Sequence, residues 1–92
     1  MKHNGKDIIV KYLPFPESVQ GYCSGLVTEC DTRYIVAIDS TRSKQKQRHT
    51  LGHELAHIYL NHFSDRSIAE QEREANSKAW HYYRIYKEQL AT

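Results

Sequence analysis

The 92-residue sequence has no apolar run long enough to cross a membrane, only two cysteines and little net charge. The charged N-terminal segment leads into three apolar residues (8–10), far fewer than the apolar core of a signal peptide contains. Cys23 and Cys30 lack CxxC spacing, so we expect free thiols rather than a disulfide or a cysteine metal site. These absences predict a cytoplasmic protein that does not engage a membrane.

The formal net charge of +2 is too small to require a nucleic acid as the partner. Basic residues recur at alternate positions, but alternate residues of a helix point about 200° apart and form no compact patch. The residues concerned are Arg42, Lys44, Lys46 and Arg48. We interpret them as a solvated helix start, and direct nucleic-acid binding is not expected.

No repeat, low-complexity tract or linker divides the chain, so residues 1–92 are expected to form a single domain with one modest core. Residues 7–13, 26–29 and 33–39 are rich in apolar and β-branched side chains and are predicted strands. The segment 14–25 contains two prolines and two glycines, which predicts a loop or a broken helix.

The second half of the sequence changes to helical spacing. Ser40 or Thr41 is predicted to cap a helix that reaches about residue 62. After a polar turn at 61–66, a capping-box pattern at 67–70 predicts a second helix that ends near residue 89. Its core-facing residues are expected to be Ile68, Ala75, Ala79, Tyr82, Tyr83 and Tyr86. The predicted fold class is α+β, with a small three-stranded antiparallel sheet packed on two long helices.

The first helix carries the sequence HELAH at 53–57. His53 and His57 are four residues apart and therefore project from the same helical face. Two neutral imidazoles so placed can bind one Zn²⁺, and Glu54 can act on the water of that ion. The pattern is typical of a zinc peptidase, in which a metal ion and a carboxylate activate water.

A catalytic zinc site needs a third protein ligand. The extended motif HExxHxxGxxH is excluded, because Leu60 and Phe63 stand where it requires Gly and His. On a continuous helix, His62 would lie about 140° from His57. We therefore expect His62 to be a surface or helix C-terminal histidine rather than a ligand.

The second helix offers a better third ligand in Glu72, with Asn76 on the same face one turn later. An amide at that position can orient a liganding imidazole. Glu70 and Glu74 are rivals, and Glu72 and Glu74 cannot both face one metal because they point about 200° apart. The choice between Glu72 and Glu74 stays open at this point.

The segment RHTLGHELAHI at 48–58, followed by EREANSKA at 72–79, resembles the ImmA/IrrE metallopeptidases. That family carries an R-x-T-x-x-HELgH helix followed by an ExEANxFA segment; here Lys78 stands in place of the usual Phe. The resemblance implies a zincin-like fold and a gluzincin-like site, with His53, His57 and Glu72 on zinc and Glu54 as the catalyst. It also implies a protein substrate, with helix-turn-helix repressors of phages, mobile elements or stress circuits as one class.

The hypothesis from the sequence is a zinc-dependent metalloendopeptidase, with Mn²⁺ as an alternative ion. Strand 26–29 or strand 33–39 could bind substrate by strand addition. His81, Tyr82 and Tyr83 are candidates for the oxyanion donor, although tyrosines at helical spacing more often belong to a core. Two other hypotheses remain: a non-hydrolysing, zinc-stabilised binding module or anti-repressor, and a metal-free helical protein in which HExxH occurs by chance.

Overall fold

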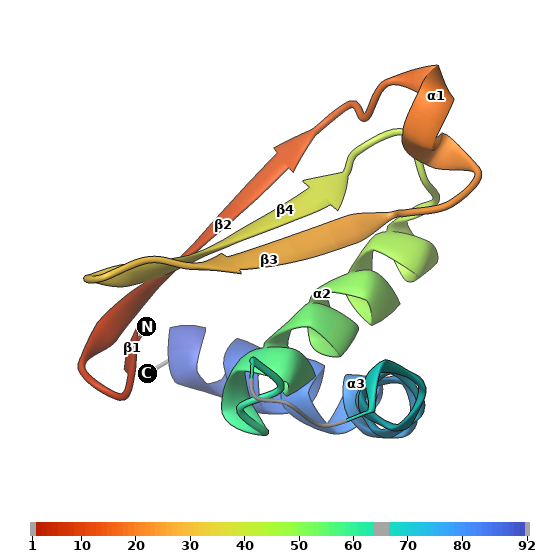
Figure 1. The fold of residues 1–92 in the computed structure, drawn as a ribbon. Helices are drawn as coiled ribbons and strands as arrows, with labels where there is room; N and C mark the ends of the chain where they lie inside the picture. The colour runs from red at the N-terminus through yellow and green to blue at the C-terminus, as the bar shows by residue number, and fades with distance from the viewer. Residues whose placement is uncertain (1, 64–66, 92) are drawn as a thin grey trace.

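The computed structural model describes residues 2–63 and 67–91, and shows a twisted sheet with its long helices on one face (Figure 1). The elements in chain order are β1 (Lys2–His3), β2 (Lys6–Leu13), α1 (Glu17–Gln20), β3 (Gly25–Glu29), β4 (Arg33–Asp39), α2 (Lys44–Tyr59) and α3 (Ile68–Leu90). The predicted strand 33–39 matches β4, and the predicted strands 7–13 and 26–29 each begin one residue later than β2 and β3. The second predicted helix is shifted by one residue from α3, whereas the first extends about three residues beyond α2 at each end.

The sheet has four strands in the order β1-β2-β4-β3, so the predicted three-stranded antiparallel sheet is wrong. β2 pairs with β4 in parallel, whereas β1–β2 and β3–β4 are antiparallel. The parallel pair is possible because α1 and β3 lie between the two strands in the chain and provide the long connection that it needs. β1 is added by a tight turn in which Asn4 (φ 53°) and Gly5 (φ 76°) take the left-handed conformation.

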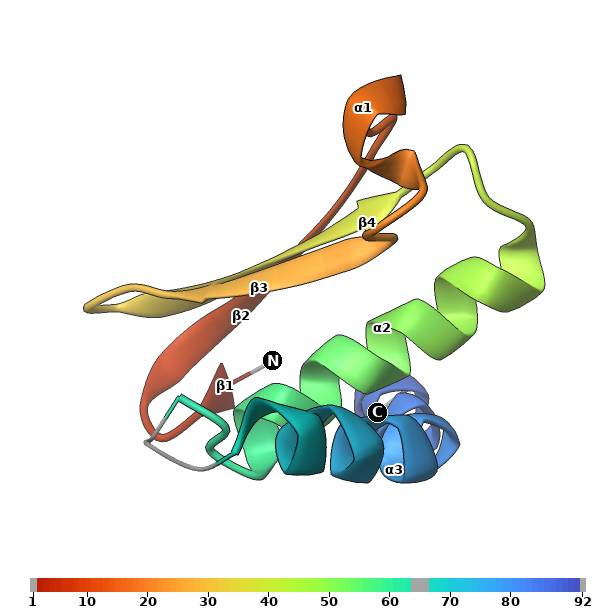
Figure 2. The same ribbon diagram turned by 45° about the vertical axis from the view of Figure 1, so that its right-hand side comes forward.

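Three layers stack in one direction, with α2 between the sheet and α3 (Figures 1 and 2). The sheet side of the core contains Ile8, Tyr34, Val36 and Ile38. The helix side contains Leu51, Leu55 and Ile58, which are spaced three or four residues apart along α2. This spacing leaves the opposite flank of α2, which carries the two histidines of HELAH, directed toward α3.

α2 begins at Lys44, and its cap is Ser43 rather than the expected Ser40 or Thr41. The Ser43 side-chain oxygen accepts a hydrogen bond from the Lys46 N–H at 3.2 Å. The helix starts late because the buried Asp39 carboxylate organises the preceding turn. It accepts from the backbone N–H groups of Phe15 (3.2 Å) and Thr41 (3.0 Å). Burial acts to raise the pKa of Asp39, but these bonds and those from the Thr41 hydroxyl and Arg42 outweigh it and lower the pKa from 3.8 to about 2.

α3 is held less tightly at its start than the capping-box pattern predicts, because the Ser67 side chain makes no cap hydrogen bond. Ile68 is 76% exposed, so its predicted place in the core is also wrong. Ala75 and Ala79 are fully buried as predicted, and the three tyrosines 82, 83 and 86 pack partly buried against the core. α3 therefore docks through small side chains, which let two helix backbones come close together.

Two further expectations concern features away from the core. Cys23 and Cys30 are both free thiols. Across residues 2–63 and 67–91, no helix combines the length and the apolar character that a membrane span requires. The predicted turn at 61–66 is described only as far as Phe63, and its remainder lies outside the described residues.

Candidate metal centre

α2 supplies the first half of the site. Glu54 and His57 are buried, and the His53 side chain is 17% exposed. Gly52 precedes His53 at a close contact between α2 and α3, where an added Cβ would overlap the carbonyl group of Ala79. Glycine at 52 and alanine at 79 therefore let the backbone of α3 approach the histidine-bearing face of α2.

α3 supplies the second half through Glu72. One carboxylate oxygen lies 2.7 Å from His53 Nε2, and the other lies 3.3 Å from His57 Nε2. One donor atom from each of these three residues lies within 4.8 Å of the other two, which is a spacing that one metal ion can span. His53, His57 and Glu72 could therefore hold a metal, as the sequence predicted.

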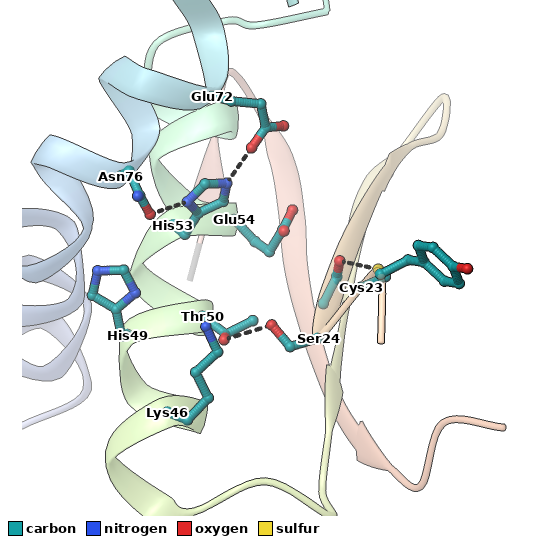
Figure 3. Close-up of a pocket in the computed structure, with 11 residues that line it drawn as sticks. Cys23, Ser24, Lys46, His49, Thr50, His53, Glu54, Glu72 and Asn76 are labelled. Carbon is teal, nitrogen blue, oxygen red and sulfur yellow. Dashed lines mark hydrogen bonds and ion pairs between the residues drawn. The ribbon is translucent and has the colours of Figure 1, made fainter. Parts of the chain in front are cut away.

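The outward-facing nitrogens of the two imidazoles are also engaged. His53 Nδ1 lies 3.1 Å from Asn76 Oδ1, so that Figure 3 shows the ring held between Asn76 and Glu72. His57 Nδ1 lies 2.9 Å from His62 Nδ1. Both rings are thus orientated from behind, with Nε2 directed at the shared position, as in histidine metal sites with outer hydrogen-bond partners.

This hydrogen-bond pattern fits a cation at the shared position. A ring whose Nδ1–H donates to the Asn76 oxygen carries a lone pair on Nε2 when it is neutral. That lone pair on His53 faces a carboxylate oxygen of Glu72 at 2.7 Å, and the two electron pairs repel unless a cation lies between them. Imidazole nitrogen and carboxylate oxygen are ligands that Zn²⁺ and Mn²⁺ both accept.

The geometry also separates the two rival glutamates. Glu72 is near both imidazoles, whereas Glu74 Oε1 lies 2.6 Å from Nε2 of His62. The expectation that His62 is a surface residue is wrong, since its side chain is only 1% exposed. It reaches His57 because α2 ends at Tyr59 and the chain then turns, whereas the sequence argument assumed a continuous helix.

Glu54 projects from α2 toward the start of β3, into a cleft of about 330 Å³ (Figure 3). Burial, and then the negative charge of Glu72, raise the pKa of this carboxyl from 4.5 to about 7. The cleft lies between residues 22–25 and the side chains of Lys46, His49 and Thr50, with His53 and Glu72 at its end. A carboxyl with this pKa, next to a possible metal position, can exchange a proton near neutral pH.

The residues suggested as oxyanion donors do not line this cleft. Tyr82 instead stacks on Tyr59 with ring centroids 5.1 Å apart, and His81 contacts the Tyr82 ring. His49, one turn before His53, does line the cleft, and the sequence analysis gave it no role. Burial, Lys46 and His53 all lower the pKa of His49, which favours its neutral form. Its position four residues before His53 was the signal that could have identified it.

His62 is the other residue that sequence reasoning misplaced. It lies five residues after His57, which is neither three nor four, so helical spacing gave no reason to connect them. The ring centroids of His57 and His62 lie 5.1 Å apart because α2 ends between the two residues. Glu74, its partner, was considered solely as a rival ligand.

The HELAH and EREAN segments lie within a region that matches a known family. The family model described as Peptidase_M78, IrrE N-terminal-like domain, matches residues 5–90. Comparison with curated proteins gave no match, and neither did comparison with solved structures. The family match spans nearly the whole chain, both helices of the site included, and the protein therefore belongs to the IrrE N-terminal-like peptidase family.

Proposed function

We propose that this protein is a zinc-dependent endopeptidase that hydrolyses peptide bonds in a protein substrate. The observation that carries the proposal is that one ligand atom from each of His53, His57 and Glu72 lies within 4.8 Å of the other two. Membership of a peptidase family supports it independently. We propose His53, His57 and Glu72 as the metal ligands and Glu54 as the catalytic residue.

Zinc held by His53, His57 and Glu72 would supply a Lewis acid that polarises the scissile carbonyl and makes a water molecule more acidic. Glu54 accepts a proton from the water while the water oxygen attacks the carbonyl carbon. The same carboxyl then delivers the proton to the leaving amine as the carbon–nitrogen bond breaks. The position of Glu54, which is buried and lines the cleft beside the three proposed ligands, suits both steps.

We propose that substrate binds along β3 as an added strand. β4 is excluded from this role because it lies inside the sheet, paired with β2 and β3. β3 is an edge strand, and among the described residues its outer side has no strand partner. Gly25 at its start lies next to Thr50 and Glu54, since a Cβ there would overlap the Thr50 methyl group. Main-chain hydrogen bonds along this edge would give affinity with little sequence preference.

The first substrates to test are helix-turn-helix repressors of phages or mobile elements, which are the class that the ImmA/IrrE resemblance implies. The test uses the zinc-loaded chain with a repressor panel and a quenched fluorescent peptide library. Glu54→Gln should lower turnover by about 10²- to 10⁴-fold, because the proton acceptor is lost. Zinc content should stay at one ion per chain, since Glu54 is not a proposed ligand.

Two outcomes would replace the proposal with one of its alternatives. If Glu54→Gln still neutralises a repressor as well as the wild type does, the protein acts by stoichiometric binding. If elemental analysis of the purified wild-type chain finds no zinc or manganese and added metal does not bind, the HELAH segment is an ordinary helix. Strand addition is tested separately, because a substrate-mimicking peptide should shift the backbone amide resonances of residues 25–29.

A further inference from the structure

The turn after α2 brings a third histidine to the back of the metal centre. Asn61 has φ 55°, and its N–H donates to the Ile58 carbonyl at 3.1 Å. The N–H of His62 donates to the His57 carbonyl at 2.9 Å. These two bonds and the left-handed residue form a Schellman motif, which ends the helix and reverses the chain. As a result the His62 ring lies beside the His57 ring, five residues earlier.

The proton positions along this contact follow from the side-chain chemistry. If His57 Nε2 is kept as a lone pair for the metal, the ring proton is on Nδ1. It then donates to His62 Nδ1 at 2.9 Å, which must be the acceptor. The proton of a neutral His62 is consequently on Nε2, where it donates to Glu74 Oε1 at 2.6 Å. Both hydrogen bonds form at once with neutral rings, and His57 is left as the metal-binding tautomer.

α3 serves both sides of the site because its two glutamates flank its packing face. Gln71, Ala75 and Ala79 form the buried stripe. At 100° per residue, Glu72 lies about 60° to one side of Ala75 and Glu74 about 100° to the other. One helix can therefore direct one carboxylate at the metal position and the other at His62. Asn76, one turn beyond Glu72, supports His53 from the same flank.

We propose that His62 and Glu74 are positioning residues of the metal centre: Glu74 orientates His62, and His62 holds His57 with its Nε2 lone pair toward the ion. The proposal rests on the metal centre of the proposed function and adds two residues that do not touch the ion. The His62 side chain is 1% exposed, so in the intact site water does not compete with it as the acceptor for His57. The hydrogen-bonded chain from Glu74 through His62 to His57 is an extended form of the carboxylate–histidine pair that supports zinc sites.

The experiment measures zinc affinity with a competing chelator, together with the unfolding temperature of the zinc-free chain. Glu74→Ala and His62→Ala each remove an acceptor from this chain of hydrogen bonds and should each raise the zinc Kd by about 10- to 100-fold. His62→Gln offers an amide oxygen to His57, so it should retain more affinity than His62→Ala. The control is Glu88→Gln, which removes the same charge from an exposed position at the far end of α3 and should leave the Kd unchanged.

His62→Ala could disturb folding because the side chain is buried, so the partly exposed Glu74 carries the decisive variant. A second measurement follows the imidazole resonances of the zinc-loaded chain. In the wild type the His57 Nδ1 proton should be resolved and protected from exchange. In His62→Ala it should be lost to exchange with water, and no such change should occur in Glu88→Gln.

The outcomes separate this proposal from the one on which it depends. If the wild type binds one zinc and Glu74→Ala and His62→Ala bind it equally tightly, the positioning role is wrong and the metal centre stands. Both variants could instead bind zinc more weakly only because their zinc-free chains are less stable. In that case the loss of zinc affinity would follow the fall in unfolding temperature, and the two residues would be merely structural. A wild-type chain that binds no zinc would overturn both proposals.

Discussion

α2 and α3 both contribute residues to the candidate metal centre but are held in the fold in different ways. α2 lies between the sheet and α3, and nine of its sixteen residues are buried. α3 has twenty-three residues and buries three of them. Ser43 caps the first helix through its side chain, whereas Ser67 at the start of the second makes no such bond.

The difference indicates that the two imidazoles belong to the rigid part of the molecule and Glu72 to a part that depends on docking. α3 is kept in place by the close approach at Gly52 and Ala79 and by partly buried tyrosines. A change in that approach should therefore disturb the metal centre more than it disturbs the sheet. The variants below test this comparison.

The largest contrast in unfolding free energy is expected between alanine substitutions at Ile58 on α2 and Ile68 on α3. Ile58 on α2 is 1% exposed, and Ile58→Ala should lower the free energy of unfolding by about 2–5 kcal/mol because it leaves a cavity in the core. The measurement is urea unfolding of the zinc-free chain. An effect below that of substitutions on α3 would mean that α2 is not the more deeply anchored helix.

Gly52→Ala tests the docking contact itself. The added methyl group would overlap the Ala79 carbonyl, so α3 has to move away, at a cost of about 1–3 kcal/mol. This loss has to exceed the gain of about 1 kcal/mol that Ala brings over Gly inside a helix. Zinc affinity should fall as well, since Glu72 moves with α3.

Gly21→Ala is the matched control for this substitution. Gly21 has φ −76°, and nothing lies within 4 Å of the position of an added Cβ. The variant should be as stable as the wild type or slightly more so, with unchanged zinc binding. If Gly52→Ala behaves in the same way, the close contact between the helices does not control the metal centre.

The substitution Asp39→Asn tests how much the hydrogen bonds of the Asp39 carboxylate stabilise the turn that precedes α2. The pKa of Asp39 is about 2 in the folded chain and 3.8 ordinarily, so as the pH falls the unfolded chain takes up the proton first. The stability that its charged form contributes is complete above about pH 4 and is lost as the pH falls to about 2. Asp39→Asn should lack this component, which unfolding curves collected between pH 5 and 2 can measure. Equal pH profiles for the two chains would contradict the assignment.

The smallest effect is expected at Ile68, the α3 partner of the isoleucine pair. Ile68 is 76% exposed, so Ile68→Ala should change the free energy of unfolding by less than about 0.5 kcal/mol. The same urea experiment applies. A loss similar to that of Ile58→Ala would show that the start of α3 packs in solution, and the contrast between the helices would disappear.

Local periodicity made part of this structure predictable. β4 and most of β2 and β3 follow from runs of β-branched and apolar residues. His53, Glu54 and His57 share a helix because the 3.6-residue repeat is a property of the backbone alone. Ala75 and Ala79 were recognisable as packing residues for the same reason.

The errors arose where the answer depends on long-range contacts. The parallel pairing of β2 with β4 joins segments more than twenty residues apart, and no local pattern specifies such a partner. The late start of α2 depends on Asp39 accepting a bond from Phe15, which lies twenty-four residues earlier. Ile68 fits a helical repeat, but its side chain is 76% exposed at the start of α3.

The amino-acid sequence by itself determined that the imidazoles of His53 and His57 lie on the same face of one helix, because residues four apart in a helix lie nearly above one another. Only the tertiary structure decided which glutamate meets them, since that depends on the rotation of α3 about its axis as it packs on α2. It also decided the place of His62, because a left-handed Asn61 ends the helix and turns the chain toward His57. Spacing along a chain describes one helix, whereas a metal centre between two helices requires their packing.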